Sequence, residues 1–258
     1  MTVTAVRYAT PLREGGSLPA IVEGDDGRLW VAKFRGAGQG TAALLADLVA
    51  GTLAQAAGLA MPELVVLELD ASFGRTERDS EIRALLAASA GTNLGVAYLA
   101  GSVGFDPAAG AVISGELASK IVAFDAFIMN VDRTARNPNL LWWNGDLWLI
   151  DHGAALYWQH DWAAGLAGAN RPFTPIRDHV LLPFADSIAT AGAALVAGLD
   201  DAALGAALAR VPDDWLSAPT DATSPAARRQ AYVDYLGARR AAASIFLEEA
   251  DRARARAV

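Results

Sequence analysis

The first hundred residues contain short runs of apolar and polar positions that are typical of β-strands. Five of these runs are rich in Val, Ile, Leu and aromatic residues and are flanked by turn-forming residues. They are residues 2–9, 17–24, 28–34, 64–69 and 93–101. Asp25, Asp26 and Gly27 predict a turn between the second and third runs. The N-terminal region is therefore predicted to be rich in strands.

Helical spacing of apolar residues begins at about residue 41. It predicts a helix over residues 41–57, which Gly58 is placed to end and Pro62 prevents from continuing. A short helix over 81–89 and a strongly apolar one over 115–130 follow. Beyond about residue 160 the pattern is almost entirely helical. The helices predicted there are residues 177–197, 200–210 and 225–254.

Strands that precede helices along a chain predict an α+β fold. We expect a two-lobed molecule, with a small strand-rich N-lobe over residues 1–100 and a larger, mainly helical C-lobe over residues 101–258. A cleft between two lobes is a common place for a ligand. The length of 258 residues is sufficient for this arrangement.

An apolar hairpin in the middle of the chain has an acidic residue on either side. Residues 138–144 and 147–150 read as strands joined by a tight turn. Asp132 precedes this hairpin and Asp151 follows it. Because antiparallel strands bring their outer ends together, we expect the two carboxylates to lie at one edge.

The spacing of Asp132, Asn137 and Asp151 is typical of the catalytic and metal-binding loops of protein-kinase-like phosphotransferases. One carboxylate, Asp132, would accept or orient the proton of an attacking hydroxyl, and Asn137 and Asp151 would hold Mg²⁺ on nucleotide phosphates. The structural alternative for Asp132 is an aspartate that caps a turn. Asn139 is assigned to the turn rather than to the metal.

Asp151 comes directly after a buried strand, where a carboxylate is costly unless it is paired or binds a metal. Gly153 is predicted to let the backbone turn sharply. His152 is interpreted as a packing or orienting residue, because Mg²⁺ prefers oxygen ligands.

Lys33 is one of only two lysines among the 21 basic residues, and it lies within a predicted strand. An ammonium group is a compact charge, which suits a phosphate partner. Asp47 is the only acidic residue of the helix over 41–57, so we predict that it pairs with Lys33. A surface lysine and an isolated surface aspartate are the structural alternatives.

Gly15, Gly16 and Ser17 lie between the first two predicted strands, where a loop could cover phosphates with its backbone N–H groups. An ordinary hairpin turn explains the same residues equally well. The Gly-rich segment 36–40 is not a Walker A loop, because no Gly-Lys-Ser/Thr follows it.

Composition excludes several classes of protein. With no cysteine, the chain cannot use disulfides, thiol catalysis or thiolate-bound zinc. The net charge of −8 argues against a dedicated nucleic-acid binder, and the Arg-rich residues 228–256 are interpreted as a solvated helix face. No uncharged apolar run reaches about 18 residues, so no membrane association is expected and the protein is predicted to be cytoplasmic.

The chain resembles the HipA-like kinase family, a branch of the protein-kinase-like and lipid-kinase-like superfamily. The residues that carry this resemblance are Val31-Ala32-Lys33-Phe34, Asp47, Leu53-Ala54, Gly58-Leu59, Pro62-Glu63, Phe124-Asp125-Ala126, Asn130-Val131-Asp132-Arg133, Asn137-Pro138-Asn139 and Ile150-Asp151-His152-Gly153. The C-terminal helices carry no matching motif.

The resemblance implies a protein-kinase-like fold that binds ATP and Mg²⁺ and transfers a phosphoryl group to a Ser or Thr hydroxyl. In that case Lys33 would contact the α- and β-phosphates, Asp132 would be the base, and Asn137 and Asp151 would hold the metal. Arg133 and Arg136 would neutralise phosphate charge. The family often has Glu where this chain has Asp47, which is one methylene shorter.

We therefore expect an ATP- and Mg²⁺-dependent serine/threonine protein kinase of the HipA-like type. A small-molecule kinase on the same scaffold and a nucleotide-binding pseudokinase that acts as a binding module are the alternatives. The phosphate acceptor, the oligomeric state and any autophosphorylation of Ser17 are left open. Because the chain is shorter than the toxin-type members, a DNA-binding antitoxin partner is not carried over.

Overall fold

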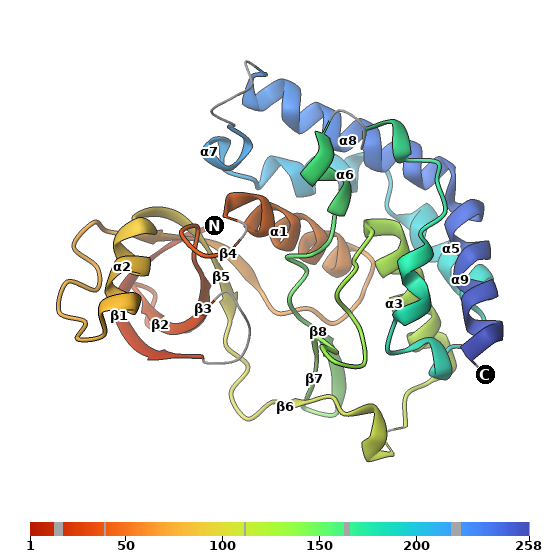
Figure 1. Ribbon diagram of the computed structural model, residues 1–258, viewed down its shortest axis with the longest axis horizontal. Coiled ribbons are helices and arrows are strands. Elements are labelled where there is room, and N and C mark those ends of the chain that lie inside the picture. Colours follow the sequence, from red (N-terminus) through yellow and green to blue (C-terminus); the bar gives the residue numbers. More distant parts are fainter. Residues whose placement is uncertain (13–17, 39, 111, 163–165, 218–222, 258) are drawn as a thin grey trace.

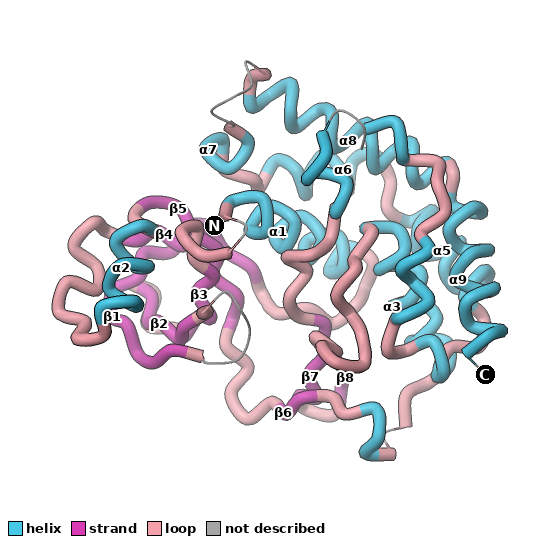
Figure 2. The backbone as a smooth tube through the Cα atoms, viewed as in Figure 1, coloured by secondary structure: helices cyan, strands magenta, loops and turns pink. Residues whose placement is uncertain are grey.

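The computed structural model describes residues 1–12, 18–38, 40–110, 112–162, 166–217 and 223–257. Strands are concentrated in the N-terminal part and helices in the C-terminal part (Figures 1 and 2). The strands are β1 (Thr2–Pro11), β2 (Ala20–Gly24), β3 (Leu29–Lys33), β4 (Leu64–Leu69), β5 (Gly91–Ala97), β6 (Val103–Gly104), β7 (Leu140–Trp143) and β8 (Asp146–Leu149). The α-helices are α1 (Thr41–Ala56), α2 (Ser80–Ala88), α3 (Gly115–Ile128), α5 (Ile188–Gly198), α6 (Asp201–Ala209), α7 (Asp213–Leu216), α8 (Pro225–Ala241) and α9 (Ala243–Ala257).

The five N-terminal strands form a closed barrel in the order β1-β2-β3-β5-β4. Four of the five pairings are antiparallel, and the barrel is closed by a parallel pairing of residues 2–4 in β1 with residues 66–68 in β4. Alternate residues of the strands point inward, and the interior is filled around the fully buried Trp30. This closed barrel fixes the position of β3, which carries Lys33.

The helix α1 lies between the barrel and the C-terminal helices. It contacts β4 and β5 on one side and α6 and α7 on the other, so ten of its sixteen residues are buried. Gly58 follows the helix with φ +73°, and the backbone bonds from Gly58 N–H to Gln55 (3.0 Å) and from Leu59 N–H to Ala54 (2.9 Å) close its end. This confirms the predicted role of Gly58.

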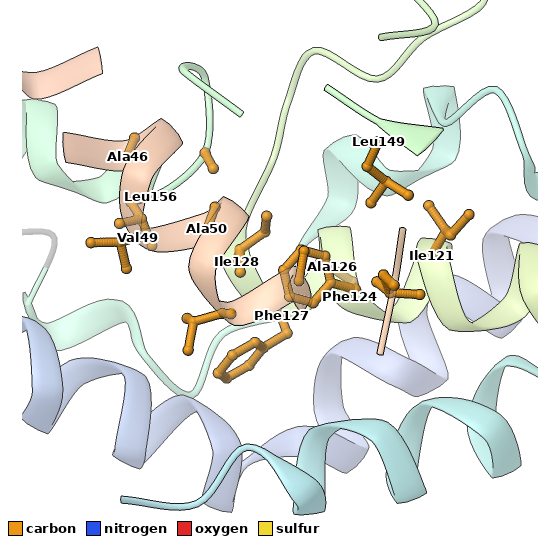
Figure 3. Close-up of a cluster of buried hydrophobic side chains, with 14 of the residues drawn as sticks. Ala46, Val49, Ala50, Ile121, Phe124, Ala126, Phe127, Ile128, Leu149 and Leu156 are labelled. Atoms are coloured by element: carbon orange, nitrogen blue, oxygen red, sulfur yellow. The ribbon is translucent and has the colours of Figure 1, made fainter. Parts of the chain in front are cut away.

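The central helix of the C-terminal part is α3, which is apolar on nearly all sides because α5, α8 and α9 surround it. Ser114 accepts a hydrogen bond from the N–H of Leu117 (3.2 Å) and so caps its start. Residues of α1 and α3 meet Leu149 of β8 and Leu156 in one apolar cluster (Figure 3). The loops on either side of the β7–β8 hairpin are therefore anchored to the core of the molecule.

Two of the predicted C-terminal helices differ from the observed ones. The predicted helix over 177–197 begins only at Ile188, because residues 174–178 and 182–184 form short 3₁₀ turns and Pro183 has no N–H for a helical bond. The predicted helix over 225–254 is broken at Ala242 into α8 and α9. No Gly or Pro marks this break; α8 packs on α6 and α7, whereas α9 packs on α3 and α5.

In the described part of the chain, no single helix has both the length and the apolar composition needed to cross a membrane. Only α5 and α6 taken together reach that composition, and they are bent by 67° relative to each other.

Candidate active site

The loops that contain Asp132 and Asp151 flank the β7–β8 hairpin, as the spacing predicted. Ile150 donates a backbone hydrogen bond to the carbonyl of Asn139 (3.0 Å), which extends the pairing toward the two aspartates. Asp151 has φ +52° and Asn139 has φ +50°, both in the left-handed region. Asn139 readily adopts this conformation, but Asp151 adopts it less often, and such backbone strain is frequently found at functional sites.

Gly153 lies in a turn, as the sequence predicted, but it does not use a positive φ there. The N–H of Ala155 donates to the carbonyl of His152 (2.9 Å) and closes this turn. The N–H of Gly153 lies 3.4 Å from Asp151 Oδ1. The carboxylate of Asp151 thus accepts from the backbone two residues later, which is the usual geometry of an Asx turn and leads into the Gly153 turn.

Lys33 joins three elements of the structure. Its Nζ donates to Asp47 Oδ2 on α1 and to Asp151 Oδ1 after β8, the latter at 2.7 Å. The side chain of Lys33 is 14% exposed, that of Asp47 is fully buried, and that of Asp151 is 43% exposed. The predicted partnership of Lys33 with Asp47 is present, and Asp151 is a second partner.

Asp47 has two hydrogen-bond partners. While Oδ2 accepts from Lys33, Oδ1 accepts from the backbone N–H of His152 at 2.8 Å. The helix α1 is therefore tied directly to the Asp151 loop as well as to β3. The short side chain of aspartate is sufficient because α1 is buried between the barrel and the C-terminal helices.

The charges in this cluster determine its protonation. Burial alone lowers the pKa of Lys33, but Asp47 and Asp151 together raise it well above its ordinary value. The charge of Lys33 lowers the pKa of Asp151 against the effect of burial, so this partly buried carboxylate is ionised at neutral pH. Burial raises the pKa of Asp47, while Lys33 and the N–H of His152 oppose that change.

Asp132 is held through one of its two carboxylate oxygens. Oδ2 accepts from the amide of Asn137 (2.7 Å) and from that of Asn139 (3.4 Å), and no bond to Oδ1 occurs among the described residues. Burial raises the pKa of Asp132, and the nearby charge of Asp151 raises it further, whereas the Asn137 bond lowers it. Because Oδ1 has no hydrogen bond among the described residues, it is available to accept a proton from a substrate.

Asn137 is exposed and turns its amide nitrogen to Asp132, which leaves its amide oxygen available as a ligand. The described residues contain no cluster of three or more His, Asp or Glu side chains that could hold a metal. The carboxylate of Asp151 and the amide oxygen of Asn137 nevertheless fit Mg²⁺, because that ion usually binds one or two carboxylates together with substrate phosphates and water.

Arg133 does not have the position expected of a phosphate ligand. Its side chain is fully buried and donates to Asp125 on α3 and to the backbone carbonyl of Asn139. Its Nη2 lies 2.9 Å from His152 Nε2. The expectation that Arg133 neutralises phosphate charge is therefore wrong. Its guanidinium points into the core, where its hydrogen bonds hold the site loops against α3. Arg136 is exposed, as that expectation requires.

Asp125 is the centre of this support and was not assigned a role from the sequence. It is fully buried, and it contacts Arg133, Asn130 (3.1 Å) and His179 Nε2 (2.9 Å). Burial would raise its pKa, but the charge of Arg133 and the bond from His179 lower it well below its usual range. An aspartate inside a strongly apolar helix signals such a buried pair, but the sequence has no comparable signal for His179.

A small cavity of about 60 Å³ lies beside the lysine, lined by Lys33, Asp47, Asp151 and residues at the start of α1. Nucleotide-sized pockets are usually roughly 300–1,000 Å³, so this cavity corresponds to one part of a nucleotide at most. A larger groove of about 460 Å³ between β1 and residues 70–77 contains none of the predicted site residues. Gly15, Gly16 and Ser17 lie outside the described residues.

Three comparisons with known proteins bear on this arrangement. A family model described as "HipA-like kinase" matches residues 6–242. A crystal structure of a Helicobacter pylori proinflammatory kinase, CtkA, is similar with a TM-score of 0.58, at 10% sequence identity and with 100% of each chain covered. At that identity the likeness shows a shared fold. No curated protein matches the chain.

Proposed function

Because the chain belongs to the HipA-like kinase family, we propose that it uses ATP and Mg²⁺ to phosphorylate a serine or threonine hydroxyl of a protein. The observation that carries this proposal is the contact of Lys33 with both Asp47 and Asp151 (2.7 Å to the latter), beside the Asp132 loop. The proposed site would lie between an N-lobe formed by the barrel and a helical C-lobe.

Each residue of the site would perform one task. Lys33 would turn its ammonium group toward the phosphates while Asp47 keeps it close. Asp151 and the amide oxygen of Asn137 would hold Mg²⁺, which neutralises negative charge on the nucleotide when it is bound. Asp132 would orient the acceptor hydroxyl and take its proton through Oδ1. Catalysis would rest mainly on positioning and charge neutralisation.

The contact between Lys33 and Asp47 also bears on the pseudokinase alternative. The only sequence feature in favour of that alternative was the shorter aspartate at residue 47, and this aspartate does reach the lysine. No described feature favours a small-molecule acceptor over a protein, so the choice between the two acceptors rests on experiment.

Thermal unfolding with ATP, with and without Mg²⁺, tests the nucleotide site. A ligand at 100 times its Kd stabilises a protein by about 2.7 kcal/mol, which is roughly 5–10 °C for a chain of this size. We expect a Mg²⁺-dependent shift in the wild type that is lost in Asp151→Ala. Asp146→Ala, which removes an exposed aspartate at the tip of the same hairpin, is the matched control. A wild type that does not respond to ATP contradicts the proposal.

Phosphoryl transfer tests the role of Asp132. We expect Asp132→Ala to lower the rate of transfer by about 10²–10⁴-fold, with ATP binding and the unfolding midpoint retained. The rate is measured as ADP production with Ser/Thr peptides and, separately, with small-molecule alcohols. Full turnover by the variant would contradict the assigned role, and ATP binding without turnover on any acceptor would favour the binding module.

A further inference from the structure

A line of buried polar side chains connects the lysine cluster to the centre of the C-terminal part. We name Asp47, His152, Arg133, Asp125 and His179 the buried polar network. All five side chains are at most 5% exposed. The network spans α1, the loop after β8, the loop after α3, α3 itself and the segment before α5, which meet near the centre of the molecule (Figure 1).

The hydrogen bonds of this network determine which ring nitrogen of His152 carries the proton. Arg133 Nη2 lies 2.9 Å from His152 Nε2, and a guanidinium can only donate. His152 Nε2 therefore accepts, and the proton of the neutral ring is on Nδ1. This Nδ1 has no hydrogen-bond partner among the described residues, and it lies 3.8 Å from Asp47 Oδ1.

The same oxygen of Asp47 already accepts the backbone N–H of His152 at 2.8 Å. The backbone N–H of His152 thus bonds this oxygen, and the ring Nδ1–H lies near it without a hydrogen bond. On its other side, the ring provides the acceptor for Arg133, which bonds the carbonyls of Asn139 and Ile150 (3.4 Å to the latter). His152 consequently connects α1 to both loops of the site.

We propose that His152 is a positioning residue. As the Nδ1–H tautomer, it fixes the Asp151 loop against α1 and against the Asp132 loop. This inference rests on the proposed function, since it concerns how Asp151 is aimed at a metal. The Nδ1–H of His152, 3.8 Å from Asp47 Oδ1, is a further donor close to the carboxylate that holds Lys33. The orientation of Asp151, one residue away, is kept by the same contacts.

Nuclear magnetic resonance of protein labelled with ¹⁵N-histidine tests the tautomer without any ligand. The chain has three histidines, and the spectra of His152→Gln, His160→Gln and His179→Gln assign them. We expect the ring proton on Nδ1 in His152 and on Nε2 in His179, whose Nδ1 accepts from the N–H of Leu181 (3.0 Å). A proton on Nε2 of His152, or a doubly protonated ring, would overturn the proposal.

Mg²⁺ titration in the presence of ATP tests the positioning role. Partners behind a metal ligand typically contribute about 10–100-fold to metal affinity, so His152→Phe should raise the Mg²⁺ midpoint by that factor. His152→Gln offers Arg133 a carbonyl acceptor and should return the midpoint to within about threefold of wild type. His160→Gln is the control at an exposed histidine.

A role in packing alone predicts the opposite order, because phenylalanine preserves the ring and glutamine does not. An unchanged midpoint in His152→Phe, or no recovery in His152→Gln, therefore refutes the positioning role. A wild type without any response to ATP and Mg²⁺ refutes the proposed function instead, while the tautomer remains measurable. If His152→Phe does not fold, the spectrum of the unmodified protein still decides.

Discussion

Asp47 is a buried carboxylate with a separate partner for each of its oxygens. Lys33 occupies Oδ2, and the N–H of His152 lies 2.8 Å from Oδ1. A longer glutamate side chain would have to displace either the lysine or the loop. The difference from the more common glutamate is therefore compatible with a complete ion pair, because the position of α1 compensates for the missing methylene.

Removing this carboxylate should destabilise the protein strongly. Breaking a buried ion pair typically costs about 3–5 kcal/mol, and Asp47→Ala also leaves the N–H of His152 without its acceptor. We expect a loss of about 3 kcal/mol in the free energy of unfolding, because Lys33 keeps Asp151 as a partner. Urea denaturation of the variant beside the exposed control Asp146→Ala measures it. A loss below about 0.5 kcal/mol, typical of a surface residue, would contradict this reading.

Acid should destabilise the protein through its buried histidines. Burial lowers the pKa of His179 below its ordinary value and that of His152 to about 3, so both rings bind protons less readily in the folded state than in the unfolded chain. In the unfolded chain they take up protons below about pH 6.5. The unfolded state then binds more protons than the folded state, so stability falls as the pH decreases from 6.5.

The pH range separates this effect from that of Asp125. The pKa of Asp125 is lowered on folding, so its contribution is present above the unfolded value of about 3.9 and is lost only below it. Between pH 7 and 5, we expect the unfolding midpoint to fall with pH in the wild type and to fall less steeply in His179→Gln. His160→Gln should retain the wild-type slope, and a slope equal in all three proteins would refute the assignment.

At the scale of elements, α3 carries residues that support the site, and the neighbouring helices pack closely against it. The guanidinium of Arg239 on α8 donates to the carbonyls of Ala126 (2.6 Å) and Phe127 (2.7 Å) at the end of α3. Burial lowers the pKa of Arg239 to about 10, which still leaves it charged at neutral pH. A cation at this end of a helix also interacts favourably with the helix dipole, so the start of the Asp132 loop is fixed.

Close packing of α5 on α3 depends on Gly192. A Cβ atom there would lie 2.5 Å from Ala123 Cβ and 2.7 Å from a methyl group of Leu247. We expect Gly192→Ala to cost about 1–3 kcal/mol, as overpacked cores do. Gly205→Ala on α6 is the matched control, because its Cβ would meet no atom within 4 Å and should stabilise the helix by about 0.5–1 kcal/mol. Equal effects in thermal unfolding would contradict this packing.

At the scale of the whole molecule, the barrel and the C-terminal helices are joined at more than the linker between them. Arg35, which follows β3, pairs with Asp214 on α7 (2.6 Å), and Thr92 on β5 donates to the same carboxylate (2.6 Å). The indole of Trp215 donates to Thr92 Oγ1 (2.9 Å). Helix α1 also packs against α6 and α7.

This double attachment predicts that the protein unfolds as one cooperative unit. Unfolding of the barrel would expose the buried face of α1 and the contacts of α7, so neither part should persist without the other. Calorimetry should show a single transition whose calorimetric enthalpy equals the van't Hoff enthalpy. Two resolved transitions would show that the barrel and the helices fold independently.

The local features of this protein follow from its sequence alone. Strand and helix periods placed β1 to β5, α1 and α3, and turn chemistry placed the β7–β8 hairpin with an aspartate on either side. These features were predictable because side-chain period and turn geometry act over a few residues. The single lysine of β3 and the single carboxylate of α1 were sufficient to predict their contact.

Which polar groups turn inward depends on the packing of distant elements and could not be predicted from the sequence. Arg133 follows the predicted catalytic aspartate, yet it is buried against Asp125, and His179 reaches the same carboxylate from 54 residues away. Three further features could not be predicted from the sequence for the same reason. They are the turns over residues 174–187, the break at Ala242 and the closure of the barrel by parallel pairing. Partners distant in sequence are selected by how whole elements pack, and local spacing carries no information about that choice.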